Sequence, residues 1–337
     1  MAVVCALVVQ LCAHGSGAVF SGDGNFVYVA ADPLLRLDFS RPNRFDAVDT
    51  STLFGGEVVH DVARDTRGNI LCVTAHHLVS YNPKTEFFTK LYDAPATATL
   101  REVACNPRDS LVLVTFESAS SEDFGNAPFA AICLLPGRDG AITVSSRMTG
   151  RIDAPAYDTY GNLYFGWRGD LWQGFVSIGN ADEWPGSANS EPVKLGPDDK
   201  AVAYLMGDRI APIARLRTAR GAAWNTGVFS IAIAADRFYL GMHAMGHEYA
   251  YLLMMARPDP TIDRPNPELP EDNYQDFFDL METVVKVPGD TLGYDMLCIS
   301  PDGRRIFYNG NPGSYYLIDN DYPPRRLPIK RDFHQAK

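Results

Sequence analysis

Four acidic residues recur along the chain, each shortly before an apolar segment that has the composition of a buried strand. They are Asp61, Glu102, Asp153 and Asp295. Carboxylate oxygens are the ligands that Ca²⁺ prefers in proteins. The four positions therefore predict a calcium site if the fold brings these segments together. Two observations favour ordinary acidic surface instead: acidic residues are common at strand starts, and Asp61 and Glu102 are one residue out of step with the other two, so strand alternation can turn them to another face.

A second candidate site is aromatic. Six large aromatic residues lie between positions 157 and 172, and two of them, Tyr160 and Trp167, stand beside predicted turns. Exposed rings at turns could form a platform that stacks against a sugar or a peptide. The alternative is packing between sheets, and the apolar surroundings favour packing for the cluster as a whole.

The common catalytic signatures are absent from the sequence. It has no Gly-x-Ser-x-Gly, no phosphate-binding loop and no dinucleotide fingerprint. His247-Glu248 begins like a zinc-protease motif, but Tyr251 stands where the second histidine belongs. We therefore predict a binding module rather than an enzyme, with no cofactor unless the acidic positions hold Ca²⁺.

A repeated pattern must position these residues. Each of six copies has an apolar segment, a turn with Asp, Gly or Asn, a second apolar segment, and a third segment shortly afterwards; the turns are centred near Gly24, Gly68, Asp109, Gly161, Asp236 and Gly303. Gly and Asn accept the positive φ that a tight hairpin turn needs, and the segments are rich in β-branched and aromatic residues, which suit strands. Each copy is thus predicted to be a hairpin followed by a third strand.

The last copy carries the most specific motif. Its segment Cys298–Phe307 contains Ser-Pro-Asp-Gly followed by Ile-Phe, which resembles the hairpins of β-propeller repeat proteins of the WD40-like, TolB-like and SMP-30/NHL kinds. The resemblance extends over nearly the whole chain, although the Trp-Asp dipeptide of standard WD40 repeats is missing. It implies an all-β fold, a single β-propeller with six blades favoured. The long step between Gly161 and Asp236 leaves seven blades as the alternative.

The resemblance also bears on the acidic positions. SMP-30-like propellers hold a metal near the central channel, so the likeness permits a second function, a metal-dependent hydrolase or lactonase with an acidic site at the channel mouth. In a propeller the innermost strands converge on that channel. We therefore expect any ligand site on the face where these strands start, which is where the four acidic residues would meet.

The two ends of the sequence and one insertion complete the predicted organisation. Residues 16–337 are expected to form the propeller domain, with an acidic, Pro-rich insertion at residues 256–279. Residues 1–15 have the apolar length of a signal peptide and end in small residues, although they lack a positively charged start. We therefore expect an exported protein, periplasmic or secreted; the alternative is a cytoplasmic protein in which this segment is a strand.

Composition narrows the partners. The net charge is −11 and the pI is about 5.1, which argues against a nucleic-acid partner, since phosphate backbones require a clustered basic surface. The apolar run at the N-terminus is too short to span a bilayer, so no membrane span is predicted. A protein or a glycan is the expected partner. The cysteines lie in apolar segments without a Cys-x-x-Cys pair, which predicts free buried thiols.

Overall fold

The computed structural model describes the strands and tight turns of the protein. The described residues are 17–31, 33–40, 45–48, 57–108, 110–118, 129–136, 142–149, 153–159, 161–167, 170–175, 211–214, 226–233, 237–244, 249–256, 282–288, 297–309, 314–319 and 327–330. Every regular element in these ranges is a β-strand. The predicted all-β class is confirmed.

The described strands form six four-stranded antiparallel sheets, and each sheet is built from one continuous stretch of sequence. The first three sheets contain β1 (Ala18–Phe20), β2 (Phe26–Val29), β3 (Leu35–Asp38) and β4 (Phe45–Ala47); β5 (Asp61–Arg64), β6 (Ile70–Val73), β7 (His77–Asn82) and β8 (Phe87–Asp93); and β9 (Ala98–Cys105), β10 (Val112–Ser118), β11 (Phe129–Pro136) and β12 (Ile142–Thr149). The other three contain β13 (Asp153–Tyr157), β14 (Asn162–Trp167), β15 (Asp170–Phe175) and β16 (Ala211–Ala214); β17 (Thr226–Ile233), β18 (Arg237–Ala244), β19 (Tyr249–Ala256) and β20 (Glu282–Pro288); and β21 (Leu297–Ile299), β22 (Arg305–Asn309), β23 (Ser314–Asp319) and β24 (Leu327–Lys330).

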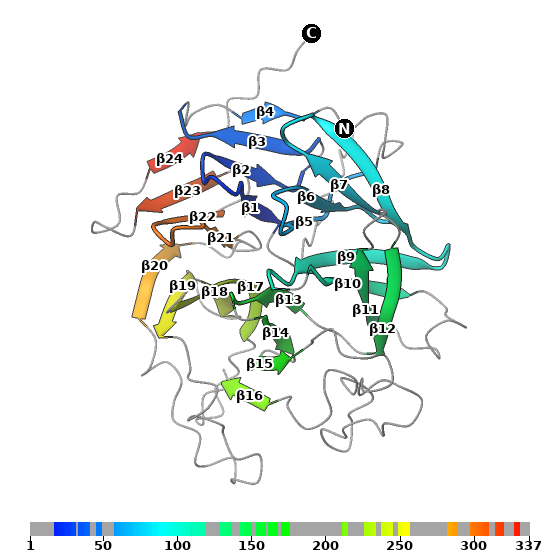
Figure 1. Cartoon of the computed structure of the whole chain (residues 1–337). Coiled ribbons are helices and arrows are strands. Elements are labelled where there is room, and N and C mark those ends of the chain that lie inside the picture. The colour runs from blue at the N-terminus through cyan, green and yellow to red at the C-terminus, as the bar shows by residue number, and fades with distance from the viewer. Residues whose placement is uncertain are drawn as a thin grey trace, which may run out of the picture.

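The sheets stand around a central axis like the blades of a fan (Figure 1). The first strand of each sheet is innermost, and each innermost strand contacts the innermost strand of the next sheet: β1 with β5, then β9, β13, β17 and β21, and β21 again with β1. The ring is therefore closed. Its first and last sheets exchange no strand among the described residues, so the described contacts across that junction involve side chains.

One arginine spans the junction between the last sheet and the first. Arg305 Nη2 donates a hydrogen bond to the carbonyl oxygen of Gly24 at 2.7 Å. The Arg305 guanidinium also lies over the rings of Phe39, 4.8 Å from the centroid, and Phe20, 5.8 Å away. Beside it, apolar residues of β1, β2 and β3 share one buried cluster with Cys298, Phe307 and Leu317 of the last sheet.

The hairpin turns form for the reason expected from the sequence. Gly24, Gly68, Gly161 and Gly303 all have positive φ, between 71° and 86°. In the first turn, Ser21 Oγ donates to Asp23 Oδ1 at 2.6 Å, and in the last turn Ser300 repeats this contact with Asp302. A short polar side chain thus fixes each turn while glycine accepts the left-handed backbone.

Packing between sheets follows from the radial arrangement. Neighbouring sheets approach most closely near the axis, so small side chains are required there and larger ones further out. Small or medium residues of the innermost strands accordingly lie directly opposite larger ones on the second strands, in the pairs Val19–Tyr28, Ala63–Leu71, Ala104–Leu113, Ala156–Tyr164, Ala232–Tyr239 and Cys298–Phe307. All six residues on the second strands are buried.

Several predictions fall partly or wholly outside the described residues: the signal peptide at residues 1–15, the insertion at residues 256–279 apart from Ala256, and the blade count. In the ranges given above, no helix is long and apolar enough to cross a membrane. The four described cysteines form no disulfide; Cys72, Cys133 and Cys298 are buried, as expected, whereas Cys105 is only half-buried.

Candidate functional site

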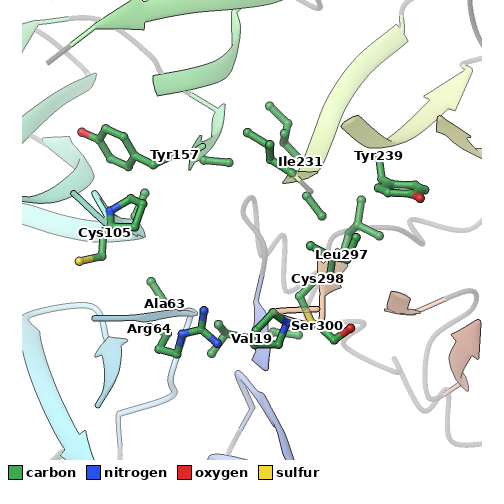
Figure 2. Close-up of a pocket in the computed structure, with 18 of the residues that line it drawn as sticks. Val19, Ala63, Arg64, Cys105, Tyr157, Ile231, Tyr239, Leu297, Cys298 and Ser300 are labelled. Carbon is green, nitrogen blue, oxygen red and sulfur yellow. The ribbon is translucent and has the colours of Figure 1, made fainter. Parts of the chain in front are cut away.

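The centre of the ring holds a cavity of about 620 Å³ (Figure 2). All six described innermost strands contribute to its wall, from Ala18, Val62 and Leu297 near the strand starts to the hairpin turns that follow the strands. Turn residues on the wall include Pro107, Thr159 and the segment 300–304. The cavity therefore extends from near the strand starts to the face that carries the turns. That a ligand binds on the face where the innermost strands start stays a prediction.

Most side chains of the wall are apolar, and those nearest the axis are small because the innermost strands pack closely there. Its central layer consists of Val19, Ala63, Ala104, Ala156, Ala232 and Cys298. One residue further along the strands, the wall carries larger and more varied side chains: Arg64, Cys105, Tyr157, Ile233 and Ile299. Arg64 is the one charged residue that a described strand contributes to the wall.

Two backbone carbonyls hold Arg64 in place. Its Nη1 donates to the carbonyl oxygen of Ser21 at 3.0 Å and to that of Phe20 at 3.2 Å, and Figure 2 shows the side chain at the cavity edge between Ala63 and Val19. Burial lowers the pKa of this guanidinium from its usual value. Within the described ranges no carboxylate lies within ion-pair distance of it. Arg64 is thus a half-buried cation that makes no described ion pair, although the charge of the adjacent Asp65 acts to raise its pKa.

The rim of the cavity at the last turn is polar. The carboxylate of Asp302 accepts hydrogen bonds from Ser300 Oγ at 2.5 Å and from the Arg304 amide at 3.1 Å. These two contacts, the Ser300 hydroxyl first, lower the pKa of Asp302. On the wall, burial raises the pKa of the Cys298 thiol well above its usual value, so this thiol is a poor nucleophile.

Two of the predicted metal ligands have another role in the structure. Asp61 is buried at 1% exposure, and its two carboxylate oxygens accept hydrogen bonds from the amides of Val62 and, on the next sheet, Val103, both at 2.8 Å. Glu102, also 1% exposed, accepts a hydrogen bond from the amide of Ala154 on the following sheet at 3.2 Å. Each carboxylate therefore ties its own innermost strand to the next one around the ring.

The remaining predicted ligands lie outside what the structure describes. Asp153 pairs with Gly166 through its backbone, but its side chain is outside the described part, as is the whole of Asp295. Neither Asp61 nor Glu102 lines the cavity, and the described residues contain no group of three or more potential metal ligands. The four-residue calcium site stays a prediction.

The aromatic platform also stays a prediction. Tyr160 lies outside the described residues, and Trp167 is described only by its backbone pairing with Asp170 in the hairpin of β14 and β15.

Arg64 was missed by the sequence analysis. Its signal is visible once the repeats are aligned: the strand residue before each turn is apolar, aromatic or cysteine in the other copies, namely Phe20, Cys105, Tyr157, Ile233 and Ile299. A lone arginine in such a series departs from the pattern of a buried strand.

Comparisons with known proteins identify the fold. No protein-family model and no curated protein sequence matches this one. A candidate gluconolactonase of known structure superposes with a TM-score of 0.54 at 10% identity, covering 93% of this protein and 90% of its own length. One subunit of a mitotic checkpoint complex superposes with a TM-score of 0.50 at 13% identity, covering 88% of each of the two proteins. The radial sheets, the closed ring and these likenesses show that the protein is a β-propeller, as its repeats predict.

Proposed function

We propose that this propeller is a non-enzymatic binding module that takes a protein partner on the face carrying the hairpin turns, with part of the partner entering the central cavity. The observation that carries the proposal is the composition of the cavity wall. Residues from all six innermost strands form it, most of them apolar, with a few polar groups at one edge. A concavity lined by mostly apolar side chains with a few polar groups is typical of ligand sites.

The chemistry of the wall favours binding over catalysis. Hydrolysis needs a group that can take a proton or attack the substrate near neutral pH. The described wall contains no histidine. Its carboxylate, Asp302, has a lowered pKa and so is a weak base, while Cys298 has a raised pKa and stays a neutral thiol. The competing function is a metal-dependent hydrolase or lactonase that uses the predicted acidic positions.

The experiment compares two tryptophan variants of the purified protein. Ala63→Trp fills the cavity from its wall, whereas Thr89→Trp places the same side chain on the exposed outermost strand β8. Both variants and the wild type are screened against a displayed peptide library and a glycan array. The same samples are assayed for bound Ca²⁺ and Zn²⁺ by elemental analysis, and for hydrolysis of sugar lactones.

We expect peptides that bind the wild type and Thr89→Trp alike, and that bind Ala63→Trp at least about 10-fold more weakly. If the peptides bind Ala63→Trp as tightly as the wild type, the central cavity is not the binding site. If the protein binds glycans but no peptide, the proposal of a protein partner is wrong. Stoichiometric metal together with lactone turnover would replace the proposal by the hydrolase.

A further inference from the structure

Arg64 differs from its surroundings in both charge and polarity. It belongs to a level of the cavity wall whose other members are Cys105, Tyr157, Ile233 and Ile299. A charged group placed in mainly apolar surroundings loses hydration, and it is costly unless a group of opposite charge compensates it. Among the described residues no carboxylate forms an ion pair with Arg64. The charge of the adjacent Asp65 favours the guanidinium only weakly compared with the effect of burial, and this carboxylate already accepts hydrogen bonds from the amides of Arg67 and Asn69. The position therefore suits an anion supplied from outside the protein.

The geometry of Arg64 leaves donors for such an anion. A guanidinium has five N–H donors in a planar fork that matches a carboxylate. The described hydrogen bonds of Arg64 use only Nη1, which donates to the carbonyls of Phe20 and Ser21. These two contacts fix the orientation of the guanidinium plane. In the described part of the molecule, Nε and Nη2 make no hydrogen bond to protein.

The charge of the cavity wall also favours an anion. The whole protein has a net charge of −11, yet the described wall carries two arginines, Arg64 and Arg304, against one aspartate, Asp302. The Asp302 carboxylate is already bound by the Ser300 hydroxyl and the Arg304 amide at the rim. Counted over the described residues, the wall therefore carries a net positive charge inside a strongly acidic protein.

We propose that the cavity binds a carboxylate on Arg64, with the apolar part of the ligand against the small side chains of the innermost strands. The inference rests on the proposed binding function and specifies its ligand: an acidic side chain of the partner or its C-terminal carboxylate. The cavity volume of about 620 Å³ is within the range of small-ligand sites, so one or two residues of an extended peptide can enter.

The test uses probes that differ only in charge. Calorimetric titration compares 3-phenylpropionate with its neutral amide, and a blocked Ala-Phe-Glu-Ala tetrapeptide with two Gln counterparts, one with an amidated and one with a free C-terminus. We expect the acids to bind and the neutral amides to bind about 10- to 100-fold more weakly, the range of a charge-assisted hydrogen bond. The two charged peptides distinguish a glutamate carboxylate from a terminal one.

Three variants assign the effect to Arg64. Arg64→Met should weaken binding of 3-phenylpropionate by the same 10- to 100-fold, and Arg64→Lys, which keeps the charge but not the fork, by less. Arg67→Met removes an arginine from the exposed turn of the same hairpin and should change nothing. If Arg64→Met does not fold, the acid and amide probes on the wild type and on Arg64→Lys still decide.

The outcomes separate this inference from the function on which it rests. Equal binding of acids and amides, or unchanged binding by Arg64→Met, would overturn the carboxylate site even if Ala63→Trp still abolishes peptide binding. If the library yields no peptide that depends on the cavity, the binding function fails, whereas binding of 3-phenylpropionate through Arg64 would still support an anion site.

Discussion

The buried carboxylate of Asp61 gives the sharpest test of how the ring is held together. Replacing Asp61 with Ala leaves the amides of Val62 and Val103 without an acceptor at a position that is 1% exposed. Each unsatisfied buried group costs about 1–3 kcal/mol. At about pH 4, where ionisation of the unfolded carboxyl contributes little, we therefore expect Asp61→Ala to lower the free energy of unfolding by about 2–6 kcal/mol.

Asp61→Asn keeps the shape of the side chain but removes its ability to ionise. Burial raises the pKa of Asp61 to about 8, against the lowering effect of the Val103 and Val62 amides. The unfolded carboxyl ionises near pH 4. Between these two values the folded state holds one proton more than the unfolded state, so the wild type loses stability as pH rises, with a slope approaching about 1.4 kcal/mol per pH unit. Asn resembles the neutral carboxyl and lacks this pH dependence.

The measurement is urea unfolding followed by tryptophan fluorescence at pH 4, 5, 7 and 9. We expect the free energies of unfolding of Asp61→Asn and the wild type to differ by no more than about 2 kcal/mol at pH 5, because the folded carboxyl is then neutral and both side chains offer one strong acceptor, and Asp61→Asn to be clearly the more stable protein at pH 9. Glu86→Gln is the control: its side chain is 70% exposed and lies 3.6 Å from Arg36, so any difference from the wild type should stay below about 1 kcal/mol and should not change between pH 5 and 9. If the free energy of unfolding of the wild type rises relative to that of Asp61→Asn between pH 5 and 9, the carboxylate is ionised in the folded state and our reasoning about burial is wrong.

Two further predictions concern the junction and the turns. Arg305→Ala removes the hydrogen bond to Gly24 and two ring contacts and should cost about 2 kcal/mol in urea unfolding, whereas Arg67→Ala in an exposed turn should cost less than about 0.5 kcal/mol; equal losses would show that Arg305 does not hold the junction. Gly68 and Gly161 have φ of +85° and +86°, but a Cβ on Gly68 meets open space while one on Gly161 comes within 3.0 Å of the Asn106 side chain. Gly68→Ala should therefore lower the free energy of unfolding by about 1–2 kcal/mol from backbone strain alone, and Gly161→Ala should lower it further. If thermal unfolding shows Gly68→Ala to be the less stable variant, the contact with Asn106 does not have the effect we infer.

The sequence predicted those parts of the molecule that depend on neighbouring residues. A positive φ at Gly68 and the strands on either side of it follow from the turn residues within a few positions, so the hairpins could be read directly. The role of Asp61 could not be, because its acceptor atoms meet the amide of Val103, 42 residues away and on another sheet. The place of Arg64 in the cavity likewise depends on how six strands converge. Contacts between sheets are set by the radius of the ring, which no local pattern encodes.

Because every sheet is drawn from one uninterrupted stretch of sequence, the order of the sheets around the axis is their order along the polypeptide. A circularly permuted protein that starts at β5 and joins β24 to β1 through a linker should therefore build the same ring. Its new chain termini would lie between the sheets of β1 and β5, where Arg64 donates hydrogen bonds to the carbonyls of Phe20 and Ser21. The Arg305 contact would then join two sheets that are consecutive in the sequence. In the permuted protein Arg64, instead of Arg305, would contact across the junction between the first and last sheets. Comparing the free energies of unfolding of the two proteins would show which of the two contacts stabilises that junction more.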